Sequence, residues 1–208
     1  MMKKIAVLFF MCLSAAVYAQ RDFEIILFDA AVNDFDVIGE DAYEKNNRVR
    51  EDITMKVKTE VKTTTKAEAA GGLSFEATNI IDGNMKTCWL SSGDGKNEDI
   101  ELTIDLEEVE GINQASVSDI YFFSGNRKDY HTWKDYNRIK KISMTVNDLP
   151  YGEIKFEDTY KQQSIDLDKF KIDRSRRCRI RLRIVDVYKG NKFNQLAVSD
   201  IQLLGRAK

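Results

Sequence analysis

Two-residue alternation of apolar and polar side chains is the strongest pattern in this sequence. Between residues 177 and 184, four arginines alternate with Cys178, Ile180, Leu182 and Ile184. This period is typical of a β-strand that turns one face to the core and the other to water. The same period extends over residues 53–61 and 100–106, and shorter candidate strands lie at 24–28, 118–123, 141–146, 164–167 and 198–203.

The predicted strands are short, and Gly, Asn and Asp residues separate them. No long run shows the 3.6-residue period of an amphipathic helix. This pattern favours an antiparallel β-sandwich or jelly roll over a parallel α/β sheet. We therefore expect an all-β fold in which residues 66–208 form the sandwich. Residues 20–65 would add N-terminal strands and an extension packed on it, including a surface excursion at 29–50.

The first 19 residues have the composition of a secretory signal peptide. Lys3 and Lys4 precede an apolar run at 5–16, and residues 17–19 match a small-residue cleavage site. The run is too short to cross a bilayer as a retained helix. The alternative is that it forms a buried first element of the fold. Cleavage would make the protein secreted, or periplasmic and associated with the cell envelope.

Charge and residue counts exclude several function classes. Removal of Lys3 and Lys4 from 32 basic residues would leave 30 against 34 acidic ones, a formal charge of −4. Nucleic acid is not favoured as a partner by this balance. The single histidine, His131, excludes sites that need two, and the chain lacks a G-x-S-x-G elbow and a Gly-rich phosphate loop. We expect a protein without enzymatic activity, although paired carboxylates among so many acids leave a hydrolase as an alternative.

A compact polar loop at residues 80–87 offers clustered oxygen atoms. Asp82 can supply a carboxylate, Thr87 a hydroxyl and a carbonyl, and Ile80 and Asn84 further carbonyls. Ca²⁺ prefers such oxygen ligands. The alternative is a metal-free loop in which the same side chains form the hydrogen bonds of an Asx-turn.

The loop also belongs to a longer motif. Asn79-Ile-Ile-Asp-Gly-Asn followed by Thr87-Cys-Trp89 resembles the N-L-I-D-G-D-x-x-T-x-W signature of discoidin-type domains, also called coagulation factor 5/8 type C or galactose-binding-like domains. The downstream segments are similar to a bacterial branch described as glycan-binding domains associated with NADases. These segments follow in order at 99–106, 120–126, 137–140, 180–184, 187–190 and 197–201.

The resemblance implies a galactose-binding-like jelly roll that binds a glycan or cell-surface polysaccharide. In relatives, an acid near the C-terminus completes the structural calcium site, and this position maps onto Asp200. Asp is shorter than the Glu that is commoner there. An alternative function is a protein-interaction or assembly module of the bacterial cell envelope, with residues 29–50 as its contact surface.

Aromatic and polar side chains gather between residues 122 and 138. Tyr130 and Trp133 could stack on the apolar face of a sugar, and His131, Asn137 and Arg138 could bond its hydroxyls. The alternative is that the aromatic residues cover an open end of the sandwich while Asn137 and Arg138 lock the strand that follows them.

Two further features each leave two interpretations open. The arginines at 177–183 could hold an anionic polymer, or they could form a solvated strand face opposed by Glu101 and Asp105 on a neighbouring strand. Cys88 and Cys178 could form a disulfide after export, or they could be two small buried apolar side chains.

Overall fold

The computed structural model describes most of the chain from residue 58 onward and two short segments before it. The described residues are 27–29, 31–32, 58–70, 72–105, 114–173 and 177–207. The predicted signal peptide and most of the predicted excursion at 29–50 lie outside them.

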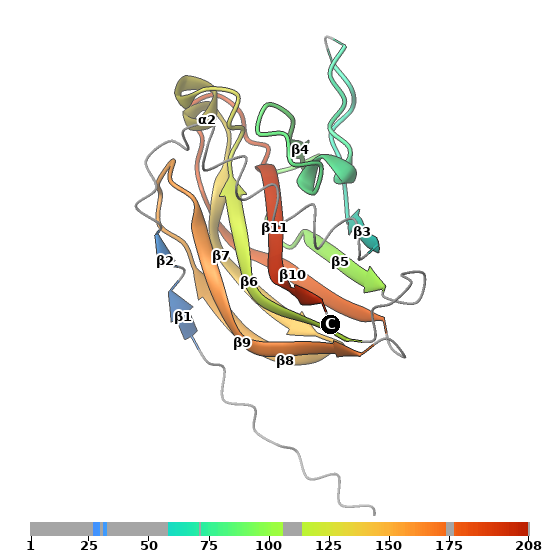
Figure 1. Ribbon diagram of the computed structural model, residues 1–208. Coiled ribbons are helices and arrows are strands. Elements are labelled where there is room, and N and C mark those ends of the chain that lie inside the picture. The colour runs from blue at the N-terminus through green and yellow to red at the C-terminus, as the bar shows by residue number, and fades with distance from the viewer. Residues whose placement is uncertain are drawn as a thin grey trace, which may run out of the picture.

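Two β-sheets pack face to face, and together they form the body of the protein (Figure 1). The first, sheet A, has the strand order β1-β8-β7-β10-β5-β3 and is antiparallel except for the β1–β8 pair. Its strands are β1 (Leu27–Asp29), β8 (Leu149–Lys155), β7 (Arg138–Val146), β10 (Cys178–Tyr188), β5 (Asp99–Asp105) and β3 (Lys58–Thr63).

The second sheet, sheet B, is antiparallel throughout and has the order β2-β9-β6-β11-β4. Its strands are β2 (Ala31–Val32), β9 (Gln163–Asp173), β6 (Gln114–Ser124), β11 (Ala197–Ala207) and β4 (Trp89–Leu90). Although β1 and β2 are almost consecutive, β1 joins sheet A and β2 joins sheet B. The described N-terminal strands are therefore part of the sandwich itself. The predicted all-β sandwich is confirmed.

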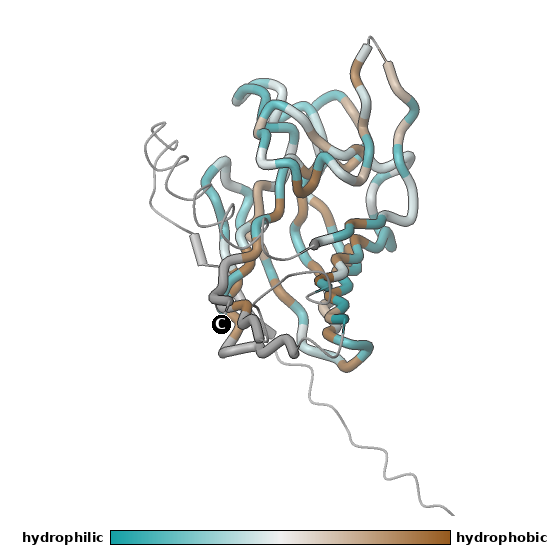
Figure 2. Tube along the Cα trace, turned by 45° about the vertical axis from the view of Figure 1, so that its right-hand side comes forward, coloured by the Kyte–Doolittle hydropathy of each residue, from teal (hydrophilic) through white to brown (hydrophobic). Residues whose placement is uncertain are grey.

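The core lies between the sheets, where the alternation in the sequence places it. On β5, Ile100, Leu102 and Ile104 are buried while the residues between them are half-exposed. In the register of the two strands, Ile180 of β10 pairs with Leu102 and Leu182 pairs with Ile100. Figure 2 shows the same alternation of hydrophobic and hydrophilic residues along the strands. Each such buried aliphatic side chain contributes about 1.5–3 kcal/mol to folding.

One central strand, β8, was not predicted. Its hairpin to β7 turns through Asn147 and Asp148, whose φ angles are 51° and 66°. Positive φ at both central residues is the geometry of a type I′ turn, which matches the twist of the flanking strands. Pro150 is tolerated because β1 pairs only with residues 153–155, after the proline.

The arginine face of β10 is confirmed as a solvated, charge-paired surface. Arg177 contacts Asp105 at 2.7 Å, and Arg181 contacts Glu101 at 3.0 Å. Both acids lie on β5, as predicted. Exposed ion pairs of this kind contribute about 0–1 kcal/mol each. This face is therefore electrically balanced and offers no excess charge to a polyanion.

The two cysteines beyond the predicted signal peptide are free thiols, and both are buried. Cys178 lies in the main core, and Cys88 lies in a smaller cluster with Leu90 and Ala197. Burial raises the pKa of each thiol to about 12, with Asp82 adding to the shift at Cys88. The interpretation as small buried apolar side chains is confirmed.

Candidate functional site

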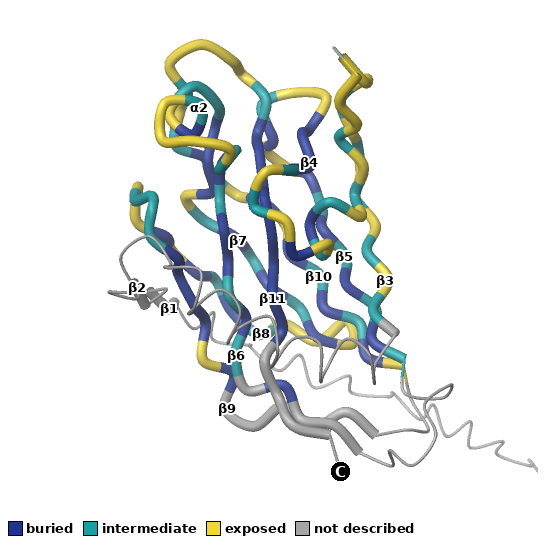
Figure 3. Tube along the Cα trace, turned by 45° about the horizontal axis from the view of Figure 1, so that its top comes forward, coloured by how far each residue is buried: buried dark blue, intermediate teal, exposed yellow. Residues whose placement is uncertain are grey.

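The short helix α2 (Tyr130–Asp135) lies at one end of the sandwich, between β6 and β7. Asp129 caps it, because its carboxylate accepts hydrogen bonds from the Thr132 amide at 2.7 Å and the Thr132 hydroxyl at 2.8 Å. These bonds lower the pKa of Asp129. In Figure 3 the strands below are largely buried, whereas α2 and the loops beside it carry many exposed residues. The helix is thus a fixed platform at the accessible end of the fold.

Trp133 anchors α2 to the sandwich. Only 4% of the residue is exposed, and its indole nitrogen donates to the Ser124 carbonyl at 3.0 Å. Gly125 makes this approach possible, because a Cβ atom there would lie 2.3 Å from Trp133 Cδ1, and the φ of Gly125 is +86°. The Arg138 guanidinium lies 4.7 Å from the centre of the indole. Trp133 therefore forms the floor of the site.

Two tyrosines form the accessible aromatic surface above this floor. Tyr130 is 50% exposed, and its ring stacks on Trp133 with centres 5.6 Å apart and planes 19° apart. Tyr160 packs edge-on against both rings, at 5.6 Å from each. Arg127 fixes Tyr160 by placing its guanidinium 4.4 Å from the centre of that ring. Both tyrosines are therefore held in position before any ligand arrives.

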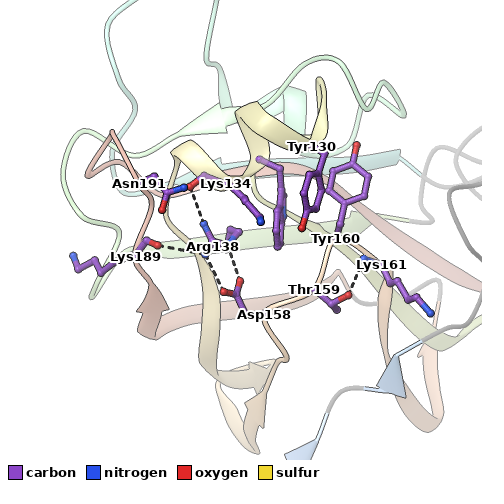
Figure 4. A pocket seen from close by; sticks show the side chains of 10 residues that line it. Tyr130, Lys134, Arg138, Asp158, Thr159, Tyr160, Lys161, Lys189 and Asn191 are labelled. Atoms are coloured by element: carbon purple, nitrogen blue, oxygen red, sulfur yellow. Dashed lines mark hydrogen bonds and ion pairs between the residues drawn. The ribbon is translucent and has the colours of Figure 1, made fainter.

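An open pocket of about 750 Å³ lies against these rings. Figure 4 shows the two tyrosines together on one side, with Arg138 facing Asp158. The pocket is built from three stretches of the chain that lie far apart in the sequence. Its lining residues are Tyr130, Trp133 and Lys134 from α2, Arg138 from β7, residues 158–161 from the β8–β9 loop, and Lys189 and Asn191 after β10.

Arg138 holds these segments together. Its Nε and Nη2 atoms contact the two carboxylate oxygens of Asp158 at 2.7 and 3.0 Å. Nη1 donates to the Tyr136 carbonyl at 2.7 Å, and Nη2 also donates to the Lys189 carbonyl at 3.3 Å. A bidentate Arg–carboxylate pair fixes geometry as well as charge. Arg138 thus shapes the pocket, with only 6% of the residue exposed.

Asn137 is fully buried beneath the same loops. Its side-chain nitrogen donates to the carbonyls of Asp94 at 3.0 Å and Asn194 at 2.6 Å, and its oxygen accepts from the Gly190 amide at 2.9 Å. All of these bonds are to the backbone of other loops. Asn137 therefore presents no polar atom to a ligand.

The predicted binding residues divide into three groups. Tyr130, Trp133 and Arg138 line one pocket, although the last two are mostly buried. His131 is exposed, with its ring centre 6.4 Å from that of Tyr130, and it does not line the pocket. Asn137 lies underneath. The contacts of Asn137 and Arg138 agree with the alternative interpretation, in which these residues lock the start of β7.

Sequence reasoning missed the half of the pocket that comes from distant loops. Asp158 and Tyr160 lie between β8 and β9, and Lys189 and Asn191 follow β10. Lys189 falls in the 187–190 segment of the family resemblance, but no local pattern marks any of these four as a binding residue. The only sequence signal was an aromatic residue, Tyr160, within an otherwise polar run.

The predicted calcium loop is closed by its own hydrogen bonds. Asp82 accepts from the Asn84 amide at 2.8 Å and from the Thr87 hydroxyl at 2.6 Å, which is the Asx-turn of the alternative interpretation. The preceding 3₁₀ helix η1 (Ala77–Ile80) contributes the buried Ile80. Asp200 is fully buried on β11 and accepts from Gln202 at 2.9 Å.

All the predicted donors are oxygen atoms, which fits a hard cation. Within the described part of the chain, no group of three or more His, Cys, Asp and Glu side chains comes together. Calcium bound by Ile80, Asp82, Asn84, Thr87 and Asp200 stays a prediction.

Solved structures share this fold, whereas no curated protein matches the sequence. The family 32 carbohydrate-binding module of Streptococcus pneumoniae EndoD matches the structure with a TM-score of 0.51 and 11% identity, over 70% of this chain and 94% of that one. The family 32 module of Clostridium perfringens NanJ, in complex with galactose, matches with a TM-score of 0.45 and 15% identity, over 70% and 92% of the two chains. At 11% identity the likeness to the EndoD module shows the fold alone.

No helix in the described ranges is long and apolar enough to cross a membrane.

The family model "NAD glycohydrolase translocation F5/8 type C domain" matches residues 53–204. It begins before the boundary predicted at residue 66, and it includes β3, which is an edge strand of sheet A. The resemblance inferred from the motifs is confirmed: this chain belongs to the family of NAD glycohydrolase translocation F5/8 type C domains.

Proposed function

We propose that this protein is a non-catalytic carbohydrate-binding module and that the pocket beside α2 holds the sugar. The observation that carries the proposal is the Tyr130 ring, which is half exposed yet stacked on the buried Trp133 at 5.6 Å. An exposed aromatic ring with a fixed orientation offers a flat apolar surface at little entropic cost.

The chemistry of the pocket suits a sugar better than a purely apolar ligand. Sugars combine an apolar C–H face with a rim of hydroxyl groups. Besides Tyr130 and Tyr160, the lining contains Thr159, Lys161 and Asn191, whose side chains carry hydroxyl, ammonium and amide groups. Such groups can bond hydroxyls while the rings contact the C–H face.

Catalysis at this pocket is disfavoured by its acids. Glycoside hydrolysis ordinarily uses two carboxyl groups, about 5–9.5 Å apart. Among the lining residues only Asp158 is acidic, and both of its oxygens contact Arg138. The lining therefore lacks the second carboxyl group that this chemistry uses. The alternative of a hydrolase therefore finds no support at this site.

The predicted signal peptide supports a role outside the cytoplasm, where glycans and cell-surface polysaccharides are exposed. The fold is also that of the EndoD carbohydrate-binding module. A single open pocket buries little ligand surface, so we expect weak binding to one site and tighter binding only where several copies engage one polymer.

A glycan array with three proteins tests the proposal. Wild type should bind a defined set of glycans, and Tyr130→Ala should lose them. Phe193→Ala is the matched control, because Phe193 is 43% exposed, stacks on Tyr136 at 4.5 Å and does not line the pocket. It should bind as wild type does. An array with no wild-type signal overturns carbohydrate binding, and loss of binding in Phe193→Ala alone overturns the choice of pocket.

A further inference from the structure

We propose that the pocket beside α2 recognises a sugar through two hydroxyl groups on neighbouring ring carbons, a vicinal diol, and that the Asp158 carboxylate accepts a hydrogen bond from each. This inference rests on the proposed carbohydrate-binding function and specifies its ligand. It is carried by the surroundings of Asp158, which lines the pocket together with the two tyrosines.

The carboxylate of Asp158 has acceptor capacity to spare. An ionised carboxylate has about four lone-pair sites, two on each oxygen. Arg138 Nε contacts one oxygen at 2.7 Å and Nη2 contacts the other at 3.0 Å, so one site on each oxygen is filled. Among the described residues, Arg138 is the one hydrogen-bond partner of this carboxylate. One acceptor site on each oxygen therefore remains.

The remaining sites are accessible from the pocket. The Arg138 side chain is 7% exposed, whereas that of Asp158 is 40% exposed. The guanidinium thus contacts the carboxylate from within the protein, and the accessible part of Asp158 belongs to the pocket lining (Figure 4). Both sites lie close together, because the two oxygens share one carbon atom. Two hydroxyl groups on neighbouring ring carbons are similarly close and can each donate to one oxygen.

The chain is held in place on both sides of Asp158. The Glu157 amide donates to the Gln163 side chain at 2.7 Å, and the Gln163 side chain donates to the Glu157 carbonyl at 3.0 Å. On the other side, Arg127 lies 4.4 Å from the centre of the Tyr160 ring. The carboxylate is therefore positioned before a ligand arrives, and binding costs little entropy to order it.

The carboxylate and the exposed aromatic ring belong to one arrangement. Trp133 stacks on Tyr130 with centres 5.6 Å apart, and Arg138, which binds Asp158, lies 4.7 Å from the centre of the indole. A sugar that packs its C–H face on Tyr130 turns an edge of its ring, where the hydroxyl groups lie, toward the pocket that Asp158 lines. Hydrogen bonds to a charged acceptor are about twice as strong as neutral ones, so they would select the hydroxyl pattern of that edge.

A second surface pocket contains a similar acid without the aromatic platform. It lies on the outer face of sheet A, with a volume of about 550 Å³. Its lining includes Asp148, which contacts Arg179 at 2.7 Å and Arg181 at 3.9 Å, but it includes no aromatic residue. Asp148 therefore provides a matched control for Asp158.

Glycans that differ by one hydroxyl group test the inference on the wild-type protein. For each glycan that the array identifies, every hydroxyl group is removed in turn, as a deoxy analogue. We expect two neighbouring positions at which the loss weakens binding about tenfold or more, because each removes a hydrogen bond to a charged group. Equal binding of all deoxy analogues, or sensitive positions that are not neighbours, would overturn the inference and leave the proposed function standing. Absence of all binding would overturn both.

The variant Asp158→Asn tests the assignment to this residue, because it keeps the shape of the side chain and removes its charge and one acceptor oxygen. The tenfold preference for the intact glycan over its deoxy analogues should fall to about threefold or less. Asp148→Asn should keep the wild-type preference. If Asp158 only supported the structure, its variant would bind all of these glycans more weakly but keep their ratio, and that result would refute the assignment. The deoxy series on wild type decides the diol even if Asp158→Asn fails to fold.

Discussion

Replacement of Trp133 by alanine tests whether this aromatic residue supports the site from below or only contacts the sugar. Only 4% of Trp133 is exposed, and its indole donates a hydrogen bond to the Ser124 carbonyl at 3.0 Å and supports the Tyr130 ring. Truncation of a buried Trp costs about 3–5 kcal/mol. For a protein of this size that corresponds to a fall in melting temperature of about 6–20 °C. We expect this loss, together with loss of glycan binding.

The matched variant is Tyr130→Ala. Because half of Tyr130 is exposed and its main described contacts are with other rings, its removal should cost about 0.5–1.5 kcal/mol. Binding should nevertheless be lost. Thermal and urea unfolding of both variants give the stabilities. If Trp133→Ala melted at the same temperature as wild type, the assignment of Trp133 to the floor of the site would be refuted. If Tyr130→Ala lost more free energy of unfolding than Trp133→Ala, the assignment of Tyr130 to the surface of the site would be refuted.

Three further predictions concern the parts that support the site. Burial raises the pKa of Cys88 and Cys178 to about 12. In protein prepared without residues 1–19, which include Cys12, thiol titration at pH 8 should therefore detect almost no reactive thiol in the folded state and two after denaturation; rapid native labelling, or a disulfide, would contradict this. Asn137→Ala removes three hydrogen bonds between a fully buried side chain and the backbone of other loops, and should lower the free energy of unfolding by about 2–4 kcal/mol, measured in urea. If calcium binds at the loop of Asp82 and Thr87, the melting temperature should be several degrees higher with calcium than with a chelator, and Asp82→Asn should remove this difference. Equal melting temperatures of the wild-type protein in the two buffers would contradict the predicted calcium site.

The body of the fold could be predicted because the alternation in the sequence records which face of each strand is buried. The apolar residues of β5, and those of β10 from Cys178 to Ile184, are buried and those between them are not, as their pattern requires. Strand β8 has no such pattern, since Pro150 and Gly152 interrupt it. Its position depends on the Asn147–Asp148 turn and on pairing with β1 and β7, and these tertiary contacts leave little mark on the local sequence.

The site could be predicted only in part. Residues 130–138 are adjacent in sequence, so their aromatic content was visible. The sequence could not show that Trp133 and Asn137 point inward while Tyr130 points outward, because a six-residue helix has too few turns to reveal a buried face. Tyr160 and Lys189 reach the pocket through the order of strands in the sheets, which no local pattern encodes.

A structure of the protein bound to a glycan identified on the array tests the central claim most directly. We predict a sugar ring in van der Waals contact with the exposed face of Tyr130. A sugar seated away from this pocket, for example on the exposed Phe193, would contradict the account.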